Sequence, residues 1–115
     1  MKKTIYLVRH GQTNFNLKGI VQGSGIDSEL NETGHQQAQK FYNYFKEVSF
    51  DVAFVSELKR THQSIAPFTL NGLNQIMMPE LNEINWGVLE GQDPTPEGYQ
   101  HFLSISKRWK RGDLH

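Results

Sequence analysis

Three short apolar runs alternate along the chain with segments of helical periodicity, and this alternation is the feature that most constrains the fold. The runs are Thr4 to Val8, Asp51 to Ser56 and Ile76 to Met78. Each is rich in apolar or β-branched residues and has the length of a buried strand. Strands that alternate with helices favour a parallel sheet joined by right-handed crossovers. The sequence therefore predicts an α/β fold.

The first intervening helix is expected to cover one face of this sheet. Asn31 or Thr33 can cap its start, and its apolar residues recur at helical spacing, at Ala38, Phe41, Phe45 and Val48. Gly34 lies in its first turn, where glycine lowers helix propensity. We expect close packing against the neighbouring strand to account for this glycine.

A second helix is predicted from Glu57 to about Leu70, with Ser56 as its cap. Pro67 lies inside it and lacks a backbone donor, so a kink or an early end is expected there, with an exit at Asn71-Gly72. A later amphipathic helix is expected after Thr95-Pro96. Its basic last turns are interpreted as a solvated helix end.

Two further segments lack a sustained period and are predicted to be loops, Asn14 to Glu29 and Glu80 to Gly91. The first begins close to Arg9-His10-Gly11, where the opening strand ends. Ligands of open α/β sheets bind at the carboxyl ends of strands. A guanidinium holds phosphate through two hydrogen bonds, and a neutral imidazole can attack phosphorus. These residues therefore predict an oxyanion site with a nucleophile.

Composition excludes several other classes of function. Twelve Lys and Arg balance twelve Asp and Glu, which gives no electrostatic case for a nucleic acid or a membrane surface as partner. The chain contains no cysteine, hence no disulfide framework and no thiolate site. Its opening apolar run is too short for a signal sequence or a membrane span, so we expect a cytoplasmic protein. No histidines have convincing metal-ligand spacing, and neither a metal nor a cofactor is expected.

Four stretches resemble the histidine phosphatase superfamily, specifically its phosphoglycerate mutase-like branch. They occur in the family's order: Leu7 to Thr13 with Asn16, then Leu30 to Gly34 followed by Gln37-Ala38, then Ser56 to Ser64, and Leu81 to Gly91. The resemblance implies a three-layer sandwich with a mainly parallel central sheet, here lacking its C-terminal strand or strands. It also implies that residues 1–115 are a single α/β domain, the N-terminal part of a longer histidine phosphatase domain.

The resemblance further implies a role for each candidate residue. His10 is the expected nucleophile, with its other ring nitrogen held by a backbone carbonyl or a carboxylate. Glu83 is the expected general acid and base. Substrate phosphate would be bound by Arg9, Asn16, Gln22, Gly23 and Arg60. Without the resemblance, Arg60 would be interpreted as a surface residue in the first turn of its helix. Glu90 is interpreted as structural.

The chain departs from the family at two points. The family has a second histidine at the end of a late strand, whereas the later histidines here follow no such strand: His35, His62, His101 and His115. In the mutases a basic residue follows the acid, whereas Ile84-Asn85-Trp86 follow Glu83. The second departure favours a phosphatase over a mutase.

The expected function is phosphoryl transfer through a phosphohistidine, with hydrolysis of phosphomonoesters as the first hypothesis. A phosphoglycerate mutase-type phosphomutase is the first alternative. A noncatalytic module that binds phosphorylated ligands is the second, if the chain ends at His115. The expected partner is a phosphorylated small molecule. A homodimer is also possible, because an incomplete sheet exposes an edge and part of a core.

Overall fold

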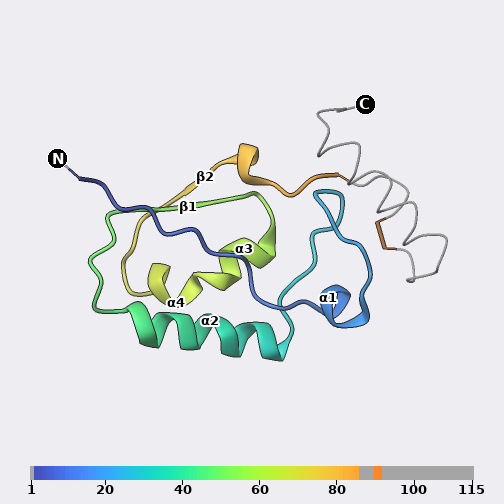
Figure 1. Cartoon of the computed structure of the whole chain (residues 1–115), viewed down its shortest axis with the longest axis horizontal. Coiled ribbons are helices and arrows are strands. Elements are labelled where there is room, and N and C mark those ends of the chain that lie inside the picture. The colour runs from blue at the N-terminus through green and yellow to red at the C-terminus, as the bar shows by residue number, and fades with distance from the viewer. Residues whose placement is uncertain (1, 86–89, 92–115) are drawn as a thin grey trace. The chain divides into compact units, whose positions relative to one another are not determined.

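The computed structural model describes residues 2–85 and 90–91 (Figure 1). The chain divides into two compact units. The first contains Met1–Thr13 and Asp27–Asn82, and the second contains Asn14–Ile26 and Glu83–His115. Helices and a short parallel sheet confirm the α/β class. That residues 1–115 form one domain stays a prediction.

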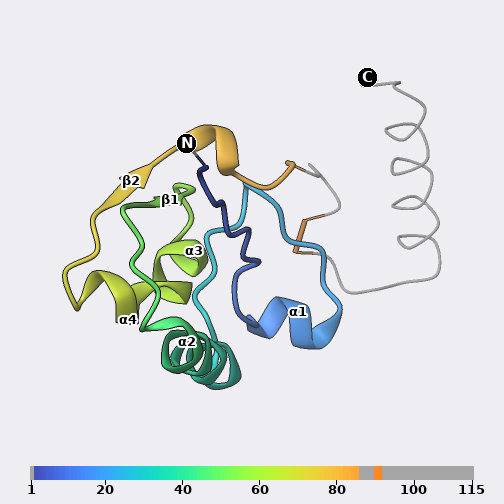
Figure 2. The ribbon, with the colours of Figure 1, turned by 60° about the vertical axis from the view of Figure 1, so that its left-hand side comes forward.

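The parallel sheet of the first unit consists of β1 (Ala53–Val55) and β2 (Gln75–Met77). Phe54 lies opposite Ile76 in the register. Strands near these two predicted positions are confirmed, each three residues long, but their expected burial is not found: all of β2 is exposed, and in β1 only Val55 is buried. The connection between them contains α3 (Lys59–Ser64) and α4 (Ala66–Thr69). Figures 1 and 2 show these two helices between the strands and the longer α2 (Glu32–Phe45).

Aromatic side chains form much of the core of the first unit. Phe68 of α4 is buried and its ring lies 5.4 Å from that of Phe41 and 4.9 Å from that of Tyr42, both on α2. Phe50 adds an edge-on contact with Phe68 at 5.6 Å. Tyr6 packs in turn on Phe50 at 5.1 Å. Aromatic pairs at these separations add stability beyond the area they bury, so this cluster fixes α2 against α4 and anchors the N-terminal segment.

The predicted helix over residues 31–48 is confirmed as α2, and Asn31 is its N-cap. The Asn31 side-chain oxygen accepts the Gly34 N–H at 2.8 Å, which satisfies one of the donors that a helix leaves unpaired at its start. The helix ends at Phe45, before Val48.

The second predicted helix is interrupted, as Pro67 indicated, and its start differs from the expectation. Ile65 has φ −115° and separates α3 from α4, and Pro67 occupies the first turn of α4, where its missing N–H costs little. Leu58, and not Ser56, is the N-cap of α3, without a side-chain cap. The Ser56 hydroxyl instead bonds the Thr61 hydroxyl at 2.8 Å. The exit at Gly72 is confirmed by its φ of +102°.

The prediction of a buried strand over residues 4–8 is wrong. The segment belongs to no strand, and Ile5 and Leu7 are 82% and 94% exposed. A strand requires hydrogen-bonded neighbours, and among the described residues β1 and β2 pair with each other and not with this segment. The first bridge along the chain comes later, between Thr13 and Leu30.

The loop predicted over residues 14–29 contains a short helix, α1 (Asn14–Lys18), which is a second correction. Another single turn, η1 (Pro79–Leu81), overlaps the start of the second predicted loop, which begins at Glu80. The helix expected after residue 95 lies outside the described residues. Within the described part of the chain, every helix is too short or too polar to cross a lipid bilayer.

Candidate active site

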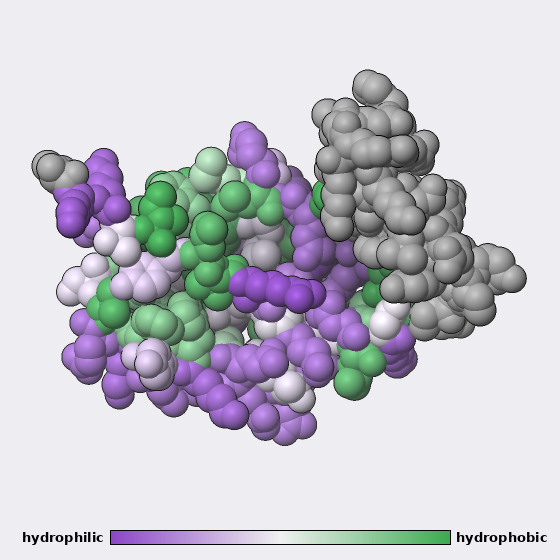
Figure 3. All heavy atoms as spheres, viewed as in Figure 1, coloured by the Kyte–Doolittle hydropathy of each residue, from purple (hydrophilic) through white to green (hydrophobic). Residues whose placement is uncertain are grey.

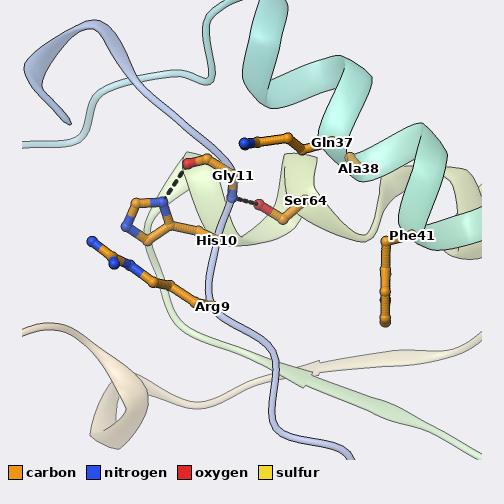
Figure 4. Close-up of a pocket in the computed structure, with 7 residues that line it drawn as sticks. All are labelled: Arg9, His10, Gly11, Gln37, Ala38, Phe41 and Ser64. Carbon is orange, nitrogen blue, oxygen red and sulfur yellow. Dashed lines mark hydrogen bonds between the residues drawn. The ribbon is translucent and has the colours of Figure 1, made fainter. Parts of the chain in front are cut away.

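A pocket of about 250 Å³ lies in the first unit, beside the segment that follows residues 4–8 (Figure 4). The N-terminal segment, α2 and α3 all contribute to its lining, which consists of Arg9, His10, Gly11, Gln37, Ala38, Phe41 and Ser64. Figure 4 shows the side chains of Arg9 and His10 extending to the same side of the segment. The pocket therefore joins a cation and an imidazole to a wall that includes two apolar side chains.

A short hydrogen bond sets the proton on the His10 ring. Nδ1 lies 2.6 Å from the carbonyl oxygen of Gly11. A carbonyl oxygen can only accept, so Nδ1 carries the proton and donates it, and the lone pair of the neutral ring is on Nε2. This is the backbone contact that a histidine nucleophile was expected to make. The geometry suits a ring that attacks through Nε2.

The segment after His10 approaches α2 more closely than side chains would allow. A Cβ on Gly11 would lie 2.8 Å from the carbonyl oxygen of Gly34, and a Cβ on Gly34 would overlap the carbonyl oxygen of Gln12. Two glycines therefore let the backbone of residues 11–12 lie directly against the first turn of α2. The expected close packing of Gly34 is confirmed, although its neighbour belongs to no strand.

Two side chains accept the amide protons of the next two residues. The Ser64 hydroxyl of α3 accepts the Gly11 N–H at 2.8 Å, and Gln37 Oε1 of α2 accepts the Gln12 N–H at 2.8 Å. Both amides are therefore already used within the protein. An anion in this pocket would be held by side-chain donors such as the Arg9 guanidinium, which presents five N–H groups.

Arg60 is fully buried on α3, and it is not among the residues that line the pocket. It is linked to the pocket through its backbone, because its carbonyl oxygen accepts the Ser64 hydroxyl at 2.6 Å. The interpretation of Arg60 as a surface residue is wrong. An arginine is always charged, and a buried charge requires compensating partners.

Four of the predicted site residues belong to the second unit: Asn16, Gln22, Gly23 and Glu83. Asn16 lies on α1, Gln22 and Gly23 are buried, and Glu83 is half-buried. Hydrogen bonds within this unit tie their segments together: Ser24 N–H donates to the Ile84 carbonyl at 3.2 Å, and Gly91 N–H to the Val21 carbonyl at 2.8 Å.

The structural interpretation of Glu90 is supported by a contact in this unit. Its Oε1 accepts the Gly25 N–H at 3.4 Å.

In the part of the chain that the structure describes, no group of three or more His, Cys, Asp or Glu side chains could hold a metal ion.

Sequence reasoning missed the pocket roles of Gln37, Phe41 and Ser64. A signal was available, because Gln37 and Phe41 are four residues apart, as are Arg60 and Ser64. Residues at this spacing share one face of a helix. The spacing could not predict that these two helix faces contact the segment after His10.

The family model described as the histidine phosphatase superfamily, branch 1, matches residues 5–114. The zebrafish (Danio rerio) protein named fructose-2,6-bisphosphatase TIGAR B is 41% identical, over 90% of this chain and 49% of its own length. The 2,3-bisphosphoglycerate-dependent phosphoglycerate mutase of Bartonella tribocorum is 33% identical, over 96% of this chain and 56% of its own length.

A solved structure shows the same fold. The alpha-ribazole phosphatase from Shigella flexneri superposes with a TM-score of 0.72 at 30% identity, over 94% of this chain and 53% of its own length. The chain thus spans about half the length of the relatives that it matches. Its match to the family model covers nearly all of its residues. The chain belongs to the histidine phosphatase superfamily, branch 1.

Proposed function

We propose that the chain hydrolyses phosphomonoesters through a phosphohistidine formed on His10. The observation that carries the proposal is the Nδ1 hydrogen bond to the Gly11 carbonyl, beside Arg9 in one pocket. A histidine with its lone pair on Nε2 and a guanidinium as its neighbour has the two groups that phosphoryl capture requires. Membership of a family whose relatives are named phosphatases and mutases supports the same chemistry.

The first step transfers the phosphoryl group to the protein. The His10 Nε2 lone pair attacks phosphorus, and a bond forms between nitrogen and phosphorus as the ester P–O bond breaks. The departing alkoxide takes a proton from the Glu83 carboxyl group, the role proposed for this residue. Arg9 balances the charge that is spread over the nonbridging oxygens. Arg60, which is buried and does not line the pocket, is proposed as a second phosphate ligand.

The second step releases inorganic phosphate. The Glu83 carboxylate removes a proton from a water molecule, whose oxygen attacks phosphorus while the N–P bond breaks. His10 returns to the neutral ring and Glu83 to the protonated acid, so the cycle closes without a net proton. Asn16, Gln22 and Gly23, which belong to the second unit, stay predicted as neutral phosphate ligands.

A phosphomutase is the second candidate, and the identity with the Bartonella mutase favours it. The two reactions differ only in the acceptor of the phosphoryl group, a hydroxyl or a water. Product analysis with 3-phosphoglycerate separates them. Isomerised phosphoglycerate indicates a mutase, and free phosphate indicates a phosphatase.

The decisive assay uses p-nitrophenyl phosphate with the chain and two histidine variants. His10→Ala is expected to abolish hydrolysis, because the nucleophile is lost. His35→Ala is the matched control, since this histidine is exposed on α2 and lies outside the pocket. Activity that survives in His10→Ala, or an unmodified chain without activity, would contradict the proposal.

A further inference from the structure

We propose that Ser64 is a positioning residue that fixes His10 relative to Arg60. This inference rests on the proposed function, because positioning has meaning only for a nucleophile and a phosphate ligand. The observation behind it is that the Ser64 hydroxyl is hydrogen-bonded to the backbone of both Gly11 and Arg60. Ser64 is 6% exposed and lines the pocket (Figure 4).

The direction of both hydrogen bonds at Ser64 follows from its partners. Gly11 N–H can only donate, so the Ser64 oxygen accepts it at 2.8 Å. The Arg60 carbonyl can only accept, so the Ser64 proton points to it at 2.6 Å. A hydroxyl is a small group that makes both bonds at once. Alanine makes neither, and threonine retains both.

This arrangement connects Ser64 to the proposed nucleophile through the backbone of Gly11. Gly11 follows His10 directly, and its carbonyl is the group that holds His10 Nδ1. The Gly11 amide and carbonyl flank the same residue, so a shift of the amide also moves the acceptor of the His10 proton. Ser64 therefore sets the direction of Nε2 through the Gly11 backbone, without touching a substrate.

Ser64 itself is not a nucleophile in this arrangement. Its proton is committed to the Arg60 carbonyl, and that oxygen is not a base that could remove it. Activation of a serine hydroxyl requires an adjacent general base. The hydroxyl acts on the reaction only through the residues that it holds.

Ser64→Ala tests the inference through kcat and KM for p-nitrophenyl phosphate. We expect kcat to fall about ten- to a hundredfold, because small misplacements of reacting groups have effects of this size. KM is expected to stay within about threefold, since the loss concerns the transition state. Ser64→Thr is expected to restore kcat, because it keeps the hydroxyl.

Thr69→Val is the matched control for general destabilisation. The Thr69 hydroxyl donates to the Ala66 carbonyl at 3.2 Å within α4, and this residue does not line the pocket. If the Ser64 hydroxyl had a purely structural role, Ser64→Ala and Thr69→Val would both lower the stability of the fold. The folded fraction of each variant would then have the kcat of the unmodified chain. If Ser64→Ala does not fold, Ser64→Cys replaces it, because sulfur is a weaker donor and acceptor.

A second readout keeps this inference separate from the proposed function. Amide hydrogen exchange at Gly11, measured by NMR, is expected to quicken about tenfold or more in Ser64→Ala, because the amide loses its acceptor. If the unmodified chain lacks activity, the proposed function fails, and unchanged Gly11 exchange would overturn the Ser64 link as well. If His10→Ala abolishes activity while Ser64→Ala or Ser64→Cys keeps full kcat, only the positioning inference is overturned.

Discussion

At the scale of residues, the pocket separates the groups that bind an anion from those that hold the backbone. The amides of Gly11 and Gln12 are occupied by Ser64 and Gln37, which leaves anion binding to side chains. Arg9 is the exposed cation among the lining residues, and it extends beside His10. Its guanidinium can hold two phosphate oxygens at once, which a lysine cannot do in the same geometry.

Arg9→Ala is therefore expected to reduce kcat/KM for p-nitrophenyl phosphate by about a hundredfold, the size of effect seen when one preorganised donor is removed. Arg9→Lys is expected to recover part of the loss, because it restores the charge but not the planar fork. Lys3→Ala removes the same charge from the same exposed segment and is expected to change little. If Arg9→Ala and Lys3→Ala had equal effects, Arg9 would act only through its net charge and not as a phosphate ligand.

At the scale of elements, the start of α2 is the surface on which the segment after His10 packs. The Asn31 cap, the Gly34 backbone and the Gln37 side chain all lie in its first two turns and all contact residues 11–12 or one another. The helix thereby connects local capping with the geometry of the pocket. A substitution that breaks the contacts between residues 11–12 and α2 would therefore move His10.

Gly34→Ala is expected to destabilise the fold, although alanine is the better helix former. A Cβ at this position overlaps the Gln12 carbonyl oxygen, and overpacking of this kind costs about 1–3 kcal/mol. Because the overlapped atom belongs to the backbone, we expect a cost above the gain of about 1 kcal/mol from helix propensity. Urea unfolding followed by circular dichroism measures the difference. His35→Ala, at the exposed neighbouring position, is expected to stay within about 0.5 kcal/mol of the unmodified chain.

Asn31→Ala is expected to lower the free energy of unfolding by about 1 kcal/mol, because the Gly34 N–H loses its side-chain acceptor. Asn31→Asp retains an oxygen at the same place and should recover most of the loss. The same urea experiment measures both variants. An aspartate variant as unstable as the alanine variant would show that the cap does not account for the role of this residue.

Elements with strong local signals could be predicted from the sequence, and elements that depend on distant partners could not. The α2 helix has a cap, an apolar period and sufficient length, and Pro67 marks the break between α3 and α4. Residues 4–8 carry an equally clear strand pattern, but within the described part of the chain no strand pairs with them. The α1 helix has five residues, too few for a period to appear. In the site, the sequence alone indicated that Arg9 and His10 could bind and attack a phosphate. The contacts of Ser64 and Gln37 could not be predicted, because they depend on how α2 and α3 pack.

At the scale of the whole molecule, the first unit exposes apolar side chains along the N-terminal segment and both strands. Ile5, Leu7, Phe54 and Met77 are each more than half exposed. Figure 3 shows hydrophobic residues gathered on this face of the unit. Exposed apolar patches in folded chains mark contact surfaces or lead to association.

We expect this chain to associate as its concentration rises, with Leu7 as a contributor. Sedimentation velocity should give a sedimentation coefficient that increases with concentration. Leu7→Lys is expected to weaken this dependence. Leu17→Lys, at an exposed leucine on α1, should leave it unchanged. A chain that sediments as a monomer at every concentration would contradict the expectation.

The most direct test of the account is the location of the phosphoryl group during turnover. The chain is mixed with p-nitrophenyl phosphate, quenched in alkali to preserve phosphohistidine, and examined by phosphorus NMR and by mass spectrometry of its peptides. The account predicts phosphorus on Nε2 of His10, with no label in His10→Ala. Phosphorus on Nδ1 of His10, on any other residue, or on none would contradict it.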